Sequence, residues 1–351
     1  MSGESSLVVS GWSAVSPFGL GADAFAAGVR TRTVTAAPPD RERWPGPAAA
    51  ACLVPGFDIR AQLGPKGTRS MDRATALAVI GVGMVLDGVA LPAAETALVL
   101  GTTTGSVRSM IGFTRDSLTG RQPFDVDPAQ FPNTVMNRAA GQSAIWHGLK
   151  GPNTTLAGGL PTVLLALNYA RRLYRAGRAS AVLCGAVEEY SSEREWLEWH
   201  NGGARQSAPL GEGCVIFLLE PEARALARGR TPLADVHPAR FGAFATPAAA
   251  REVLRDRIVA ALADAGAAGE EVRSVAPHGG DDDYGTAELA ALRDVFGDVE
   301  AVSCGDLIGE TASVSAGFQL ATLLATGAGT TGVVTSVDRD GVAGATVVRV
   351  R

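Results

Sequence analysis

One segment, residues 150–177, constrains the possible folds of this chain more than any other. It predicts a short strand, a tight turn at Gly158-Gly159 and then a helix, whose first turn accommodates Pro161 because a missing N–H costs little there. Apolar residues recur at helical spacing in that helix, and arginines in its last turn suit the helix dipole. Strand-to-helix elbows of this kind usually present a nucleophile beside backbone N–H groups that stabilise negative charge. Residues 158–161 include no Ser, Cys or His, so this turn offers no nucleophile.

Strands and helices alternate along the rest of the chain, and the second half repeats the rhythm of the first. The pattern predicts strands at 7–11, 97–100, 180–185, 211–220, 233–236, 272–276, 301–303, 332–336 and 345–350. It predicts helices after the elbow, after 67–75, where Asp72 favours the first turn, and at 132–146, 247–265, 286–296 and 313–326. Residues 32–56 and 190–210 are predicted to be loops.

Bulk properties exclude several classes of protein. With 351 residues, the chain is long enough for two packed units or one large α/β domain. Its net charge of −5 argues against a nucleic-acid-binding protein. The four cysteines are far apart in sequence, so we expect neither disulfides nor a metal site, and no cofactor. No signal peptide and no apolar run of membrane-spanning length is present, so we expect a cytoplasmic protein.

The elbow also carries a family resemblance. Gly151-Pro152-Asn153, the strand, the turn and the helix up to Gly177 resemble the active-site elbow of the β-ketoacyl synthases, condensing enzymes of thiolase fold. An early Pro-x-Gly turn, a Met-Asp-Arg run before a helix and the Gly-Glu-Gly at 211–213 are similar to the same family. The resemblance implies an α/β thiolase-like fold with two duplicated βαβαβ halves, residues 1–229 and 230–351, in α-β-α-β-α layers.

The residues that the family uses for condensation are mostly replaced. The family's Cys falls on Leu160 without gaps, or on Leu156 if a gap is allowed, while Gly305 takes the Lys position and Glu310 that of the second His. His278 matches the first His, and the closing Gly-Phe-Gly-Gly turn is placed at 341–344. Condensation by the family mechanism needs a thiolate and two imidazoles, and Glu310 would put negative charge where the reaction develops it. An isolated His278 is more often a structural hydrogen-bonding residue than a catalyst.

One branch of the family lacks the Cys. Chain length factors, the β subunits of type II polyketide ketosynthases, keep a Gly-Gly-Leu like that at 158–160, although they usually have Gln at the Cys position. The resemblance implies a non-catalytic subunit, inactive alone, of a polyketide or fatty-acyl 3-oxoacyl carrier-protein synthase, with a catalytic α subunit and an acyl carrier protein as partners. Two alternatives stay open: a repurposed thiolase-fold enzyme using His278, Glu310 and Asp281–Asp283 on an acyl carrier substrate, or a homodimeric acyl-binding scaffold.

The same resemblance implies an interface and a tunnel. In the family the elbow strand pairs across a two-fold axis, which predicts an obligate dimer burying well over roughly 2,000 Å². An unpaired strand edge would otherwise favour aggregation. The predicted interface residues are Asn153, Thr154, Thr155, Leu156 and Ala157. Met110, Phe113 and Met136 are predicted to close an acyl tunnel, because they are bulky and Met is adaptable; the alternative is that they are ordinary core residues.

Overall fold

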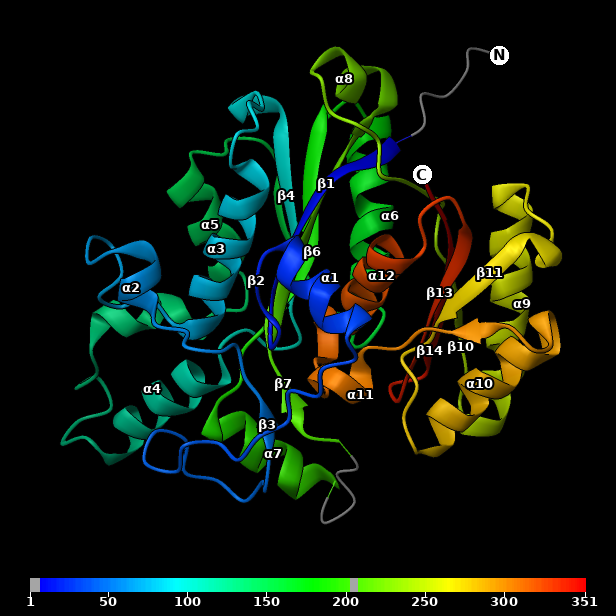
Figure 1. The fold of residues 1–351 in the computed structure, drawn as a ribbon. Helices are drawn as coiled ribbons and strands as arrows, with labels where there is room; N and C mark the ends of the chain where they lie inside the picture. Colours follow the sequence, from blue (N-terminus) through cyan, green and yellow to red (C-terminus); the bar gives the residue numbers. More distant parts are fainter. Residues whose placement is uncertain (1–6, 203–207) are drawn as a thin grey trace.

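The structure, a computed structural model, describes residues 7–202 and 208–351. It contains one large mixed sheet, whose two halves have helices on their outer faces and a further layer of helices between them (Figure 1). The strands of this sheet are β1 (Leu7–Ser16), β2 (Gly19–Leu20), β4 (Thr96–Gly101), β5 (Asn153–Leu156), β6 (Ala181–Glu188), β8 (Gly213–Pro221), β9 (Ala234–Val236), β10 (Arg240–Ala243), β11 (Val272–Ala276), β12 (Glu300–Ala301), β13 (Thr331–Asp338) and β14 (Val342–Val350). β3 (Ala51–Cys52) and β7 (Leu210–Gly211) form a separate pair.

The sheet has an internal duplication. Its order is β12-β11-β13-β14-β9-β1-β8-β6-β4-β5, with β10 beside β14 and β2 beside β1. Read outward from the centre, β1-β8-β6-β4-β5 matches β9-β14-β13-β11-β12 strand for strand. In both halves the two inner pairings are antiparallel and the two outer pairings are parallel. The predicted thiolase-like architecture of duplicated halves is therefore confirmed. The boundary at residue 229 stays a prediction, since hydrogen bonds between β1 and β9 join the two halves into one sheet.

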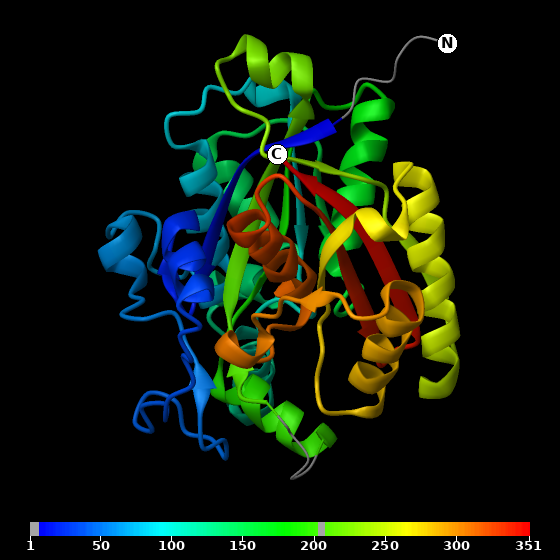
Figure 2. The ribbon, with the colours of Figure 1, turned by 45° about the vertical axis from the view of Figure 1, so that its right-hand side comes forward.

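The helices form three layers around the two halves of the sheet (Figures 1 and 2). On one outer face lie α3 (Arg73–Leu86) and α5 (Arg138–His147); in the centre lie α1 (Ala22–Arg30), α6 (Thr162–Arg175) and α12 (Ser315–Thr326); on the other outer face lie α9 (Pro247–Ala265) and α10 (Asp283–Phe296). Strand periodicity explains this layering: on β8, residues 215, 217 and 219 face the central helices, while 214, 216 and 218 face α3.

Further helices occupy the connections. These connecting helices, of which α4 and α7 are as long as some helices of the layers, are α2 (Ile59–Leu63), α4 (Val107–Thr119), α7 (Ser192–Gly202), α8 (Glu222–Ala227) and α11 (Gly305–Ile308). Single turns of 3-10 helix lie at Ala93–Glu95, Gly269–Glu271 and Ala312–Val314, and a longer one lies at Pro128–Thr134. Within the described residues, no helix combines the length and the apolar character needed to cross a membrane.

Several sequence-based element boundaries are wrong. β1 continues to Ser16 instead of ending at residue 11, and the helix predicted at 132–146 is divided into a 3-10 turn, which contains Pro132, and α5, which begins at Arg138. The 190–210 loop contains α7, and its residues 203–207 lie outside the described residues. The prediction for Asp72 is confirmed, because its carboxylate accepts the Thr75 N–H at 2.7 Å and caps α3.

Candidate functional site

The elbow is built as predicted, with Pro161 one position before α6 instead of in its first turn. β5 ends at Leu156, and the chain turns through Gly159, whose φ of 61° lies in the left-handed region that favours glycine. The Thr162 hydroxyl closes the turn: it donates to the Gly159 carbonyl at 2.6 Å and accepts the Gly158 N–H at 3.0 Å. Leu164, Leu167 and Ala170 of α6 are buried in the central layer. The position after the two glycines is therefore held firmly at one end of the sheet.

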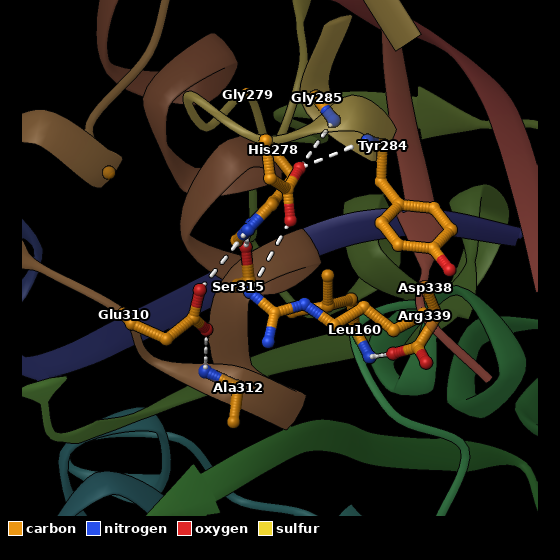
Figure 3. A network of polar contacts seen from close by, with 12 residues as sticks. Leu160, His278, Gly279, Tyr284, Gly285, Glu310, Ala312, Ser315, Asp338 and Arg339 are labelled. Carbon is orange, nitrogen blue, oxygen red and sulfur yellow. Dashed lines mark hydrogen bonds and ion pairs between the residues drawn. The ribbon is translucent and has the colours of Figure 1, made fainter. Parts of the chain in front are cut away.

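Leu160 stands at that position. It lines a cavity of about 500 Å³, whereas Leu156 lies in β5 and packs against the core. The gap-free alignment is thus the one that puts a residue at the site. The Leu160 N–H donates to the Asp338 carboxylate at 2.6 Å (Figure 3). The elbow presents an aliphatic side chain in place of a nucleophile, and an acid of the same chain accepts its N–H.

His278 and Glu310 meet across the same cavity. Nε2 of His278 lies 3.2 Å from Oε2 of Glu310, and Nδ1 lies 2.7 Å from the Ser315 hydroxyl at the start of α12 (Figure 3). The other Glu310 oxygen accepts the Ala312 N–H at 2.7 Å. Both nitrogens of the imidazole and both oxygens of the carboxylate therefore have protein partners. The position of Glu310 is further fixed because its N–H donates to the Pro209 carbonyl at 2.8 Å.

The two charges stabilise each other. Burial alone would lower the pKa of His278, but the Glu310 carboxylate, with Glu288 and Asp282 nearby, outweighs it and raises the pKa to about 9. Burial would likewise raise the pKa of Glu310, yet His278 and the Ala312 N–H lower it to about 2. His278 is an imidazolium and Glu310 a carboxylate at neutral pH. In this ion pair the imidazolium has no free nitrogen to accept a proton and the carboxylate is already hydrogen-bonded, so the pair is a poor general base.

Both halves of the chain contribute to the cavity wall, which is rich in charge. Its charged residues are Arg194, Glu198, His278, Asp282, Glu310, Asp338, Arg339 and Asp340. The cavity lining includes no cysteine and no lysine. The four thiols, Cys52, Cys184, Cys214 and Cys304, are buried in the core, and burial raises the pKa of each. No group of the wall can form the thioester on which family condensation depends.

Other predicted site residues lie differently. Gly305 begins α11 and is not part of the cavity wall. Of the acidic run 281–283, Asp282 lines the cavity and caps α10 by accepting the Tyr284 and Gly285 N–H groups; Asp281 and Asp283 are exposed and absent from the wall. The closing turn was placed wrongly. Residues 342–344 belong to β14, and the turn that faces the cavity is 338–341, since β14 begins at Val342, three residues before the predicted start of this strand.

The predicted tunnel residues lie at or near the surface of the described chain. Met110 and Met136 are 39% and 40% exposed, and Phe113 is half-buried, with its ring centroid 5.9 Å from that of Phe131. The two methionines are therefore not core residues here, and they are free to contact a partner. The tunnel role stays a prediction.

The predicted interface strand lies at an end of the sheet. β5 pairs with β4 on one side, and no second neighbour is present among the described strands. Asn153 is exposed and the next three residues are partly buried. The outer edge of β5 is available for pairing, while the dimer itself stays a prediction.

Sequence reasoning missed the residues that hold the site together. They are Ser315 and Glu288, which bind the His278 ring and backbone, Arg194, which donates to the Glu310 carbonyl, and Asp338. A three-residue shift of the closing turn toward the N-terminus, from 341–344 to 338–341, would have brought Asp338 opposite the elbow. The other three contacts depend on tertiary packing.

The duplicated halves and the elbow facing a His-containing cavity define a thiolase-like condensing-enzyme fold. Residues 4–225 match the model of the β-ketoacyl synthase N-terminal domain, more than half of the chain. This chain therefore belongs to the β-ketoacyl synthase family.

Individual proteins of this family show which members the chain is similar to. The chain is 41% identical to a solved structure described as the ishigamide ketosynthase/chain length factor, with a TM-score of 0.91, covering 98% of this chain and 99% of that chain. It is 28% identical to the tetracenomycin polyketide synthase ketoacyl synthase alpha subunit of Streptomyces glaucescens, over 79% of this chain and 72% of that protein. It is 26% identical to a 3-oxoacyl-[acyl-carrier-protein] synthase 2 of Vibrio cholerae, over 65% of this chain and 62% of that protein. The match thus spans less than two thirds of the Vibrio synthase's length.

Proposed function

We propose that this chain is a non-catalytic, chain-length-factor-like subunit of a type II polyketide, or fatty-acyl, 3-oxoacyl carrier-protein ketosynthase heterodimer. One observation carries the proposal: the family fold is complete around the elbow, yet Leu160 replaces the nucleophile. The 41% identity to a ketosynthase/chain length factor structure over almost the whole chain supports the same subfamily.

The chemistry of condensation explains why the site is inactive. The reaction needs a thiolate to carry the acyl chain and neutral imidazoles or other donors where negative charge develops. Here Leu160 cannot be acylated, and the Glu310 carboxylate places a fixed negative charge beside His278. A catalytic partner must therefore supply the thiolate. The contribution of this chain is then structural: its edge strand β5 completes the dimer, and α4 walls the partner's acyl channel.

A second cavity supports an acidic or phosphorylated partner such as an acyl carrier protein. It has a volume of about 510 Å³ and lies between α3, α4 and the 43–73 region. Four of its arginines, Arg43, Arg60, Arg69 and Arg108, have no carboxylate within ion-pair distance in the described part of the chain. Guanidinium groups without an ion-pair partner favour phosphate and carboxylate ligands. Five acids, Asp58, Asp72, Asp116, Asp127 and Glu189, line the same cavity, so these arginines, and not the net charge of the wall, support an anionic partner.

The repurposed-enzyme alternative has less support. His278 and Glu310 are each used fully in internal hydrogen bonds, and two of the three acids at 281–283 lie outside the cavity wall. The homodimeric scaffold alternative would use the same β5 edge as the heterodimer. The structure of one chain therefore does not distinguish these two hypotheses, and an experiment must.

The test is coexpression of this chain with an intact Cys-His-His ketosynthase α subunit. We expect the two chains to co-purify in equal amounts, and only the pair to release carbon dioxide from a malonyl carrier substrate. Carbon dioxide release by this chain alone would support the repurposed enzyme. A stable homodimer that does not bind the ketosynthase would support the homodimeric scaffold alternative.

A further inference from the structure

Asp338 occupies an unusual position at the end of β13. Its side chain is only 7% exposed, although no Lys, Arg or His of the described residues forms an ion pair with it. Backbone N–H groups hold the carboxylate instead: Oδ1 accepts the Asp340 N–H at 2.8 Å, and Oδ2 accepts the Leu160 N–H at 2.6 Å. The Asp338 carbonyl accepts the Gly341 N–H at 3.0 Å, which closes the turn. The turn therefore fixes the carboxylate so that one oxygen points at the elbow.

The elbow is shaped to receive this carboxylate. Gly159 adopts a φ of 61°, and a Cβ at this position would lie 2.0 Å from Oδ2 of Asp338. A side chain at residue 159 would thus be excluded by both the backbone conformation and the acid. Two segments 178 residues apart in the sequence fit together at one hydrogen bond (Figure 3).

The N–H that Asp338 occupies is the group that a ligand of this cavity would need. A backbone N–H at the apex of a strand-to-helix elbow, close to the start of a 14-residue helix, attracts carboxylates and polarised carbonyl oxygens. A hydrogen bond to a fixed, ionised carboxylate is shorter and stronger than one to a neutral carbonyl. A visiting carbonyl would also meet the negative charges of Asp338 and Glu310. The Asp338 carboxylate therefore binds the Leu160 N–H in preference to an oxygen atom of an external ligand.

We propose that Asp338 is a built-in latch: its carboxylate fills the anion-binding position of the elbow and closes the cavity of this chain to carboxylates and acyl carbonyls. The inference rests on the proposed function, because it names the group that keeps a non-catalytic site empty. Loss of the nucleophile makes the site inactive, whereas the latch makes it unoccupied.

The experiment measures the Leu160 amide directly. The full-length chain is labelled with ¹⁵N-leucine, the Leu160 resonance is identified by its loss in Leu160→Met, and sodium acetate alone is titrated as the probe. We expect no response in the wild-type protein or in Asp340→Ala, a control that removes an exposed acid of the same turn. In Asp338→Ala the Leu160 resonance should move upfield before titration and then shift saturably as acetate binds.

Asp338→Asn is a second variant for the case that Asp338→Ala does not fold. Its side chain retains the shape of Asp338, and its amide oxygen can still accept the Leu160 N–H, while the negative charge is lost. Its Leu160 amide should move upfield relative to wild type. The latch is refuted if acetate shifts Leu160 equally in wild-type protein and in Asp338→Ala, or if Asp338→Asn leaves the resonance unchanged. Neither readout depends on condensing activity or on a partner, so failure of the latch and failure of the proposed function are distinguishable.

Discussion

At the scale of single residues, the site is defined by which charges replaced catalytic groups. Glu310, which the family resemblance aligns with a second imidazole, pairs with His278, and Asp338 accepts the elbow N–H of Leu160. In each case a carboxylate satisfies a donor that would otherwise face the cavity unpaired. Because leaving a buried donor unsatisfied costs about 1–3 kcal/mol, these acids stabilise the folded state around the cavity.

The His278–Glu310 pair predicts a pH dependence of stability. His278 has a pKa raised from 6.5 to about 9, so its contribution is complete below pH 6.5 and is lost as the pH rises through 9. Glu310 has a pKa lowered from 4.5 to about 2, so its contribution is complete above pH 4.5 and is lost as the pH falls through 2. The pair therefore stabilises the fold fully between these limits, pH 4.5 to 6.5.

Glu310→Gln should lower the pKa of His278 and flatten the loss of stability above pH 6.5. Because the two side chains are 19% and 32% exposed, we expect a cost of about 1–2 kcal/mol in unfolding free energy at pH 6. Denaturant unfolding across pH 5–10 and NMR titration of the His278 ring measure both effects. Glu300→Gln, at an exposed acid, is the control. An unchanged His278 pKa would show that the pair does not form.

Leu160→Cys should not restore condensation. The new thiol would lack a neutral imidazole partner, because His278 is paired with Glu310, and its N–H would still donate to Asp338. We expect acyl transfer to the variant to stay at the background rate of the wild-type chain, measured by radiolabelled acyl carrier substrate. Condensation by the single variant at partner-like rates would contradict this account of the site.

At the scale of elements, β5 and α4 are two parts of the described chain that have open surroundings. Every other parallel strand of the first half has neighbours on both sides among the described strands, while β5 has one. α4 buries a single residue, Val107, and carries Met110 on its exposed surface.

Thr155→Asp tests assembly at the β5 edge. Thr155 is partly buried in the middle of β5, so a carboxylate there would be desolvated on pairing and should dissociate the dimer or make the chain insoluble. Size-exclusion chromatography with light scattering gives the result. Thr231→Asp, at an exposed position, should leave the dimer intact. A wild-type chain that is a stable monomer in the presence of its partner would rule out this interface.

Phe113→Ala tests the channel wall on α4. If Phe113 closes the channel, the reconstituted pair should make longer products at a near-normal rate. A purely structural Phe113 would instead cost about 1–2 kcal/mol of stability, less than the 3–5 kcal/mol typical of a fully buried Phe, without any change in product length. Mass spectrometry of the products decides between them, and Phe296→Ala, a half-buried Phe on α10, should leave product length unchanged.

At the scale of the whole molecule, the architecture was predictable because it repeats a local rhythm. The periodicity of 247–265 and 272–276 gives the observed bounds of α9 and β11 without change. The elbow at residues 150–177 could be aligned with the family pattern because it has no insertions. β10 and α4 were missed, since few of their residues are buried: none in β10 and only Val107 in α4. The Asp338 contact was missed because its two residues are far apart in the chain and the closing turn had lost its glycine pattern.

The most direct test of the central claim is the intact mass of each chain after the reconstituted pair is primed with an acyl carrier substrate. The account predicts that the acyl adduct appears on the catalytic partner and that this chain, of 36.0 kDa, stays unmodified. Replacing the partner's active-site Cys by Ala should abolish the adduct on the partner and leave this chain unmodified. An acyl adduct on this chain, formed at the rate of the partner's own acylation, would contradict the account.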